Sequence, residues 1–283
     1  MTKKQLKILG IKALLQLFFI SLSLVTLIPV LYAISISFSS SNTLVSSDFS
    51  FFPKEFTFSN YTNLFTNQPL LLWFRNSLIL ASATLILALS VSIPSAYAFS
   101  RLRFKARGSL FKILIYLNAF PAILSMFAIW KLFSTGPVQL INTRIGLVII
   151  YAGTMAIFGI LNLKGYFDTV PAEIEDAARI DGASEFQVVT KILLPLAKPS
   201  IIVTGVLILI FVWNEYIFAI TFMTGSDKFT LAAGLYGLQA GEMSGSWPLF
   251  TAAALITALP ILIIFLIIQR HMVSGLTVGG VKA

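Results

Sequence analysis

Apolar stretches long enough to cross a lipid bilayer constrain this chain more than any other feature of its sequence. They run for about 19 to 29 residues, and a helix needs about 20 apolar residues to cross ~30 Å of hydrocarbon. Because lipid offers the backbone no hydrogen-bond partners, such runs fold as helices. The sequence therefore predicts an all-α membrane protein with a single transmembrane domain over residues 1–283. Its six spanning helices are expected at roughly 13–36, 72–100, 109–134, 145–163, 200–222 and 248–269.

The composition excludes several other classes of protein. Of the 283 residues, 57% are apolar and 11% are charged, whereas a soluble domain of this length needs more charges to cover its surface. The absence of cysteine and the single histidine, His271, exclude disulfide scaffolds and zinc sites built from Cys and His. The net charge of +9 could indicate nucleic-acid binding, but the basic residues lie at the ends of apolar runs. There they act as topology signals, so we expect no nucleic-acid partner.

The distribution of Lys and Arg predicts the orientation of the chain. If the N-terminus is inside, fifteen of the twenty basic residues fall on inner segments and five on outer ones. Positive charge favours the cytoplasmic side, so we expect both termini in the cytoplasm. The tryptophans then lie at or near the outer ends of the spans, as interfacial anchors would. The outer basic residues are Lys54, Arg75, Lys131, Arg144 and Lys228, and the tryptophans are Trp73, Trp130, Trp213 and Trp247.

Residues 171–195, here called the acidic segment, lie between the fourth and fifth predicted spans. Six of the eleven carboxylates of the chain fall in residues 168–185. Pro171 suits the first turn of a short helix, on which Ile174, Ala177 and Ala178 would share one narrow face. A helix resting on the bilayer would be rich in Lys and Arg with large apolar anchors. The acidic, small-residue composition instead favours docking against a partner protein.

A break and a second helix are predicted after this first one. Gly182 can end the first helix in a left-handed conformation. Ser184 and Gln187 form the pattern of a capping box, which begins a second helix. Pro195 and Pro199 then kink the path into the fifth span.

The acidic segment resembles a loop of the permease subunits of ABC importers. Its spacing fits the family pattern E-A-A-x(3)-G-x(9)-I-x-L-P throughout, with an Asp in place of the usual Glu, which keeps the charge. The matching residues are Asp176, Ala177, Ala178, Gly182, Ile192, Leu194 and Pro195. The resemblance implies that these residues, together with the neighbouring Glu175 and Asp181, form a cytoplasmic coupling helix and its surroundings, which dock on an ATPase.

Three other stretches are similar to the maltose and maltodextrin type of sugar permease. They are residues 52–61, residues 213–216 and the tail 275–282. The resemblance implies one membrane subunit of an ATP-driven importer of maltose, maltodextrin or a related oligosaccharide, in a bacterial cytoplasmic membrane. It also implies a second homologous permease subunit, two cytoplasmic ATPases and an extracytoplasmic sugar-binding protein. The tail residues that would reach toward the ATPases are Gly275, Leu276, Thr277, Gly279 and Lys282.

The chain lacks the sequence of a phosphate-binding loop. It contains no G-x-x-x-x-G-K-[ST] pattern and no Gly-Lys dipeptide. If transport is driven by ATP, the nucleotide must bind another chain. We therefore expect a permease subunit that is not itself an enzyme and binds no cofactor, with ATP and magnesium held by the partner ATPase and membrane lipid as the surroundings of this chain.

Glu215 is the one carboxylate predicted inside a span. Because an unpaired charge there costs about 2.5–3.5 kcal/mol on insertion scales, it should face the bundle or a wet cavity. It could bind a sugar hydroxyl near the transport path, together with its neighbours Trp213, Asn214 and Tyr216. It could equally form a fixed bond with Asn214 or with a neighbouring span.

Two other classes of protein fit the sequence less well than an importer permease does. A secondary transporter or channel subunit would normally show paired inverted repeats and charged residues in several spans. A membrane-embedded enzyme would need clustered His, Asp or Glu near one face of the membrane. Neither pattern is evident in the sequence. A permease for another small solute stays open, because only the resemblance indicates a sugar.

Overall fold

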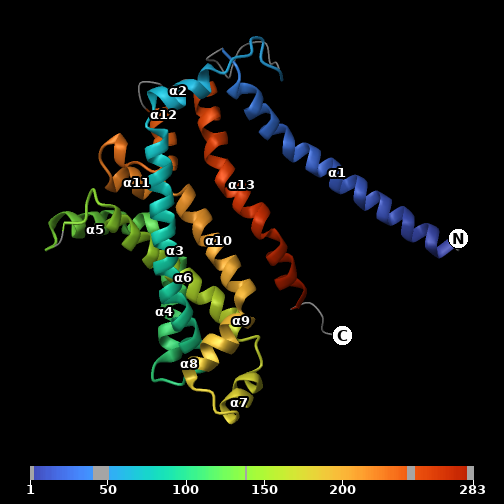
Figure 1. Ribbon diagram of the computed structural model, residues 1–283, viewed down its shortest axis with the longest axis vertical. Helices are drawn as coiled ribbons and strands as arrows, with labels where there is room; N and C mark the ends of the chain where they lie inside the picture. The colour runs from blue at the N-terminus through green and yellow to red at the C-terminus, as the bar shows by residue number, and fades with distance from the viewer. Residues whose placement is uncertain (1–2, 41–50, 138, 241–245, 279–283) are drawn as a thin grey trace. The chain divides into compact units, whose positions relative to one another are not determined.

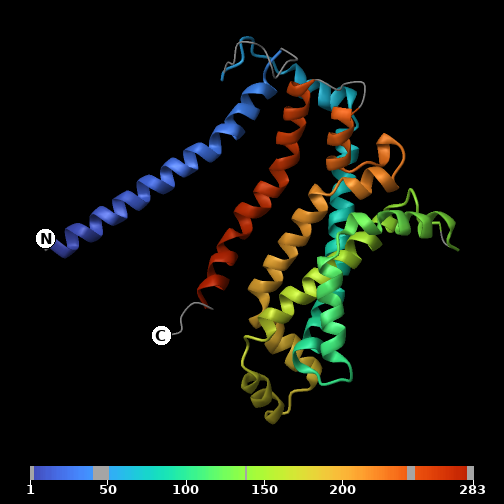
Figure 2. The ribbon, with the colours of Figure 1, turned by 180° about the vertical axis from the view of Figure 1, so that it is seen from behind.

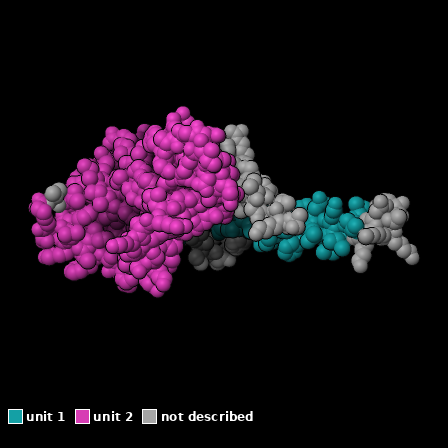
Figure 3. All heavy atoms as spheres, turned by 90° about the horizontal axis from the view of Figure 1, so that it is seen from below, with its two compact units in different colours: residues 1–68, 237–258 teal, residues 69–236, 259–283 magenta. Residues whose placement is uncertain are grey.

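The computed structural model describes residues 3–40, 51–137, 139–240 and 246–278, and for residues 3–7 and 270–278 it describes the backbone alone. The chain divides into two compact units, residues 1–68 with 237–258 and residues 69–236 with 259–283 (Figure 3). The described residues contain helices and one isolated bridge between Ser39 and Phe56, and no strand. The all-α prediction is confirmed.

The first unit holds a long helix that packs on little within this chain. Helix α1 (Lys3–Ser37) contains an apolar stretch, Ile8–Ser37, with a mean hydropathy of 2.4, and of its described side chains only Ser37, at its end, is buried. Its end is fastened to α2 (Ser59–Asn67), because Asn60 Nδ2 donates to the carbonyl oxygens of Ser37 and Ser39, both at 2.9 Å. Within its own unit the apolar surface of α1 is left uncovered, as is typical of a spanning helix where it meets lipid.

Three helices form the frame of the second unit (Figures 1 and 2). Helix α3 (Leu70–Arg101) packs along α6 (Arg144–Phe167), and α10 (Lys198–Asn214) packs against both. Small residues allow the close approach, since a Cβ on Gly159 would collide with Ser92. Small side chains at such contacts are typical of helices that associate in membranes.

The predicted span 109–134 is broken in the structure into two helices. Helices α4 (Arg107–Ala119) and α5 (Ala122–Thr135) meet at an angle of 96°. Pro121 lacks a backbone N–H and disfavours the helical conformation of the residue before it. Phe120 is accordingly extended. With about 1.5 Å of rise per residue, neither piece crosses the bilayer alone.

The predicted span 200–222 is also interrupted, at Glu215 and Tyr216. Helix α10 ends at Asn214 and α11 (Ile217–Phe222) follows, because Glu215 is extended. Four helices of the described residues are long and apolar enough to span a membrane, and six do so if each of two bent pairs counts as one span. The remaining elements are the 3-10 turn η2 (Ser226–Lys228), α12 (Leu231–Ala240) and α13 (Trp247–Val278).

Two of the tryptophans do not lie where interfacial anchors would. Trp73 and Trp213 are buried within the second unit. Trp73 Nε1 donates to the carbonyl oxygen of Ser226 at 2.7 Å, and its ring lies so close to Gly234 that a side chain there would collide with it. For these two residues the anchor interpretation is wrong, because their rings fill the packed interior.

Candidate functional site

The acidic segment lies at one end of the frame helices, below α6 and α10 in Figure 1. Its local structure confirms the predicted turn and cap. Gly182 has a φ of +84°, and Ser184 Oγ accepts a bond from Gln187 N while Gln187 Oε1 accepts one from Ser184 N. The segment comprises α7 (Ala172–Ile180), α8 (Glu185–Gln187), the π-helix η1 (Val188–Leu193) and α9 (Leu194–Leu196).

An apolar cluster holds the acidic segment on the frame. Val170 and Leu193 are buried there against the last turns of α3 and α6 and the start of α10. Burial of such side chains contributes about 1.5–3 kcal/mol each. The cluster consists of Ala96, Tyr97, Leu163, Phe167, Val170, Leu193 and Ala197. The segment is thus a packed part of the second unit and not a loose loop.

Glu175 is the most deeply buried carboxylate described in the acidic segment, with 1% of its surface exposed. Its Oε1 accepts a bond from Arg101 Nε at 2.6 Å. Its Oε2 lies 3.6 Å from Arg179 Nη2. Arg101 Nη2 also donates to the carbonyl oxygen of Val170 at 2.7 Å. A buried charge needs such partners, because leaving it unpaired is costly.

Arg179 links the two helices of the acidic segment. It pairs with Asp176 and with Glu185, each at 2.8 Å, and Tyr97 OH donates to Glu185 Oε2 at 2.9 Å. The bonds from Arg179 and then from Tyr97 hold the pKa of Glu185 below its usual range. The bond to Glu185 in turn raises the pKa of Arg179. Both groups therefore stay charged at neutral pH.

Asp168 closes the end of α6 beside the same cluster. It accepts bonds from Lys164 Nζ at 2.5 Å and from Ser100 Oγ at 2.6 Å. Partial burial works against the charged carboxylate, but the bonds from Lys164 and Ser100 outweigh it and lower the pKa of Asp168. The last turns of α3 and α6 are joined through this carboxylate.

The predicted docking residues do not all face outward. The ridge predicted from Ile174, Ala177 and Ala178 is only partly exposed, because Ala178 is buried, like Glu175, while Ile174 and Ala177 are exposed. Turned inward, Glu175 and Ala178 attach the helix to the frame. Asp176, Asp181, Gly182 and Pro195 are also exposed, and Ile192 and Leu194 are partly buried.

Two exposed apolar side chains are not among the predicted docking residues. Ile180 has 86% of its surface exposed and Phe186 has 77%. Large apolar side chains are costly to expose in water outside a membrane. The signal was present in the sequence, since both residues interrupt an otherwise acidic stretch.

The second candidate site is the interruption between α10 and α11. Glu215 Oε2 accepts a short hydrogen bond from Tyr151 OH of α6, and Oε1 accepts one from Phe218 N at 2.9 Å. The carboxylate thereby caps the free backbone end of α11. The predicted bond to a neighbouring span therefore exists, and its donor is Tyr151 of α6. Asn214 Nδ2 donates instead to the carbonyl oxygen of Ile210 at 2.8 Å.

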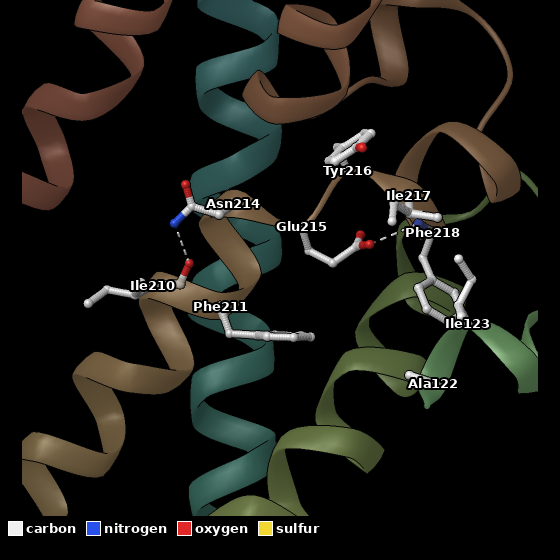
Figure 4. A pocket seen from close by; sticks show the side chains of 9 residues that line it. All are labelled: Ala122, Ile123, Ile210, Phe211, Asn214, Glu215, Tyr216, Ile217 and Phe218. Atoms are coloured by element: carbon white, nitrogen blue, oxygen red, sulfur yellow. Dashed lines mark hydrogen bonds between the residues drawn. The ribbon is translucent and has the colours of Figure 1, made fainter. Parts of the chain in front are cut away.

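A pocket of about 420 Å³ opens beside this interruption (Figure 4). Glu215 and Asn214 are its polar lining residues, while Phe211 and Tyr216 contribute aromatic surface. Tyr216 also stacks on Tyr236, with ring centroids 5.2 Å apart. The lining residues are Ala122, Ile123, Ile210, Phe211, Asn214, Glu215, Tyr216, Ile217 and Phe218.

Trp213 does not take the position predicted for it beside the transport path. Only 3% of its surface is exposed, and its ring packs edge-on against Phe74 with centroids 5.9 Å apart. In a helix, consecutive residues point in different directions, so Trp213 faces the core when Asn214 faces the pocket.

The predicted tail lies at the edge of what the structure describes. Gly275, Leu276 and Thr277 continue the backbone of α13, whereas Gly279 and Lys282 lie outside the described residues. Within the described ranges, no three His, Asp or Glu side chains gather as a metal site would require.

Helices that pack closely yet stop where a pocket opens suit a chain that lets a solute pass through a membrane. The acidic segment at the end of the frame helices is held by ion pairs and leaves apolar side chains exposed. This arrangement suits a chain that binds a partner protein at that end. The fold and its two sites define a transport permease. The chain belongs to the family of binding-protein-dependent transport system inner membrane components, whose pattern matches residues 10–278.

Individual relatives and one solved structure agree with this family. The inner membrane ABC transporter permease protein YcjP of Escherichia coli (strain K12) is 33% identical over 99% of this chain and 98% of its own length. The maltose/maltodextrin transport system permease protein MalG of Vibrio vulnificus (strain YJ016) is 39% identical over 76% of this chain and 73% of its own. A bacterial ABC transporter involved in the import of the acidic polysaccharide alginate has a chain of the same fold, with a TM-score of 0.74, 24% identity, and coverage of 95% and 98%. The chain is a multi-pass inner-membrane protein.

Proposed function

We propose that this chain is one permease subunit of an ATP-driven importer of maltose, maltodextrin or a related oligosaccharide. The observation that carries the proposal is the acidic segment, which has the spacing of an ATPase-docking loop and is joined to frame helix α3 by the ion pair of Glu175 with Arg101. A loop tied to the frame by an ion pair to a buried carboxylate can pass on a displacement, as a solvated loop cannot.

Docking on an ATPase explains the outward face of the acidic segment. Ile180, Phe186 and Ala177 would enter a groove of the partner, while Asp176 and Asp181 offer charge at its rim. Apolar anchors surrounded by charges are typical of such interfaces. ATP and magnesium would then be bound by the partner ATPase, with no cofactor on this chain.

The sugar is supported by the relatives and by the chemistry of the pocket. A relative that is 39% identical carries the name of a maltose and maltodextrin permease. Asn214 and Glu215 offer hydrogen-bonding groups for hydroxyls, and Phe211 and Tyr216 offer rings on which a sugar can stack. This pocket would form part of this subunit's half of the translocation path, completed by the second permease.

The Lys and Arg bias supports an orientation with both termini in the cytoplasm. In this orientation the acidic segment and residues 275–282 of the tail would lie on the side of the ATPases. The segment before α2 would lie on the side of the sugar-binding protein. Cysteine labelling of this cysteine-free chain tests it: Glu185→Cys should react from inside and Lys54→Cys from outside. Labelling of both from the opposite sides would contradict the orientation.

Reconstitution in proteoliposomes tests the function. The chain, its second permease, the ATPases and the binding protein should take up a malto-oligosaccharide only when ATP is inside. Uptake by this chain and its second permease without the ATPases, driven by an ion gradient, would contradict the proposal. Preference for a peptide or a metal complex would contradict the sugar as substrate, while the proposal of an ATP-driven importer would stand.

A further inference from the structure

The acidic segment is attached to helix α3, which is distant from it in sequence. Arg101, the last residue of α3, is 74 positions before Glu175 in the chain, yet their side chains meet at 2.6 Å. The same guanidinium also binds the carbonyl oxygen of Val170. One side chain thus holds both α7 and the backbone that leads into it.

A second bond from α3 reaches the other helix of the acidic segment. Tyr97 OH donates to Glu185, which is also bound by Arg179. Tyr97 and Arg101 are four residues apart on α3 and therefore share one face of that helix. Because Arg179 joins Glu185 to α7, both helices of the segment are fastened to the same turn of α3.

The route from the acidic segment into α10 is built differently. The backbone passes through the π-helix η1 and then bends by 74° before α10 begins. A π-helix is a rare and less regular turn that often marks a functional site. Motion of the segment can thus be absorbed at this bend, whereas the ion pair to α3 leaves little freedom.

We propose that Arg101 and Glu175 form a strut through which the acidic segment moves helix α3. Glu175 is buried between two guanidinium groups, so separating it from Arg101 leaves the buried charge beside Arg179 alone, at 3.6 Å. Helix α3 packs along α6, which passes the displacement into the frame. Arg101 and Glu175 are positioning residues in this account. The inference rests on the proposed function and names the helix that the ATPase moves.

Distance measurements between spin labels test the strut in the complete transporter, with its second permease, ATPases and binding protein. Labels at Glu173→Cys, in the first turn of α7 and outside the proposed docking residues, and at Val91→Cys on α3 occupy exposed positions in a cysteine-free chain. Their distance should stay constant through the ATP cycle, and Arg101→Ala should make it vary with nucleotide. A distance that varies equally with and without Arg101 would overturn the strut.

Coupling gives a second readout that a loss of stability alone would not change. Arg101→Ala should raise the ATP hydrolysed per sugar transported several-fold, with the ATPases still bound. Arg103→Ala, an exposed arginine two residues on, should leave the ratio unchanged. If Arg101→Ala does not assemble, the double variant Arg101→Gln with Glu175→Gln carries both measurements, because it removes the ion pair without leaving a buried charge. An unchanged ratio would overturn the strut, whereas absence of ATPase binding by the unaltered chain would contradict the proposed function instead.

Discussion

Two carboxylates in the second unit are satisfied in different ways. Glu175 lies between the guanidinium groups of Arg101 and Arg179, outside the spanning helices. Glu215, within an interrupted span, accepts bonds from the neutral donors Tyr151 OH and Phe218 N. A pair of charges resists separation strongly, while bonds from neutral donors cost less to exchange. The comparison suggests a rigid connection at the ATPase end and an adjustable one at the pocket.

The largest expected effect is the loss of the charge pair at the rigid end. Arg101→Ala leaves Glu175 buried beside Arg179 alone, and removal of one partner of a buried pair costs about 3–5 kcal/mol. Thermal unfolding of the purified protein in detergent should show the loss. Glu175→Gln with Arg101→Gln, which removes both charges, should cost less. Equal losses for the single and double variants would contradict the charge-pair account.

The turn that aims the acidic segment should matter next. Gly182 has a φ of +84°, so Gly182→Val forces a β-branched residue into a left-handed conformation at a cost of about 1–3 kcal/mol. No other group lies near its missing Cβ, so the effect is one of backbone strain. ATPase co-purification should fall. Gly165→Val, at a helical glycine with equally open space, is the control and should retain it.

A smaller effect is expected at the pocket. Glu215→Ala removes the cap of α11 at a cost of about 0.5–2 kcal/mol, while Tyr151→Phe removes one hydrogen bond worth about 0.5–1.5 kcal/mol. Both variants should bind the ATPases normally. Sugar uptake should fall more in Glu215→Ala than in Tyr151→Phe. Loss of ATPase binding in either variant would contradict the separate roles assigned to the pocket and to the acidic segment.

Acid should weaken the rigid end by the smallest amount. Hydrogen bonds from Arg179 and Tyr97 hold the pKa of Glu185 below its ordinary 4.5. A lowered folded-state pKa contributes stability that is complete above the ordinary value and is lost as the pH falls through the folded-state value. Hydrogen exchange of residues 172–187 should therefore be unchanged from pH 7 to 5, after correction for the intrinsic rate. It should rise only below about 4.5, and Glu185→Gln should abolish that rise.

The two regions also differ in how far the sequence could predict them. The turn at Gly182 and the capping box at Ser184 depend only on residues close in sequence, so local patterns were sufficient to predict them. The partners Arg101 and Tyr97 lie more than seventy residues away, and one sequence contains no signal that joins them to Glu175 or Glu185. Likewise, the position of Glu215 inside a span was visible, but its hydrogen-bond partner Tyr151 lies on another helix.

Hydropathy predicted the helices but not their interruptions. Apolar residues continue through Phe120 and through Tyr216, so the runs 109–134 and 200–222 read as single spans. Pro121 was visible, yet proline bends some membrane helices and is accommodated in others. The sequence pattern also could not predict which face of α7 is buried, because the burial of Glu175 is an exception to the rule that charged side chains face water.

Photocrosslinking at the exposed apolar side chains of the acidic segment tests the central claim most directly. A benzoylphenylalanine at Phe186, which is 77% exposed, should crosslink to the ATPase in the assembled importer. The same group at Phe127 of α5, which is 78% exposed, is the matched control. The account predicts an ATPase crosslink at 186 and none at 127. No crosslink at 186, or one at 127 alone, would contradict the acidic segment as the surface on which the ATPase docks.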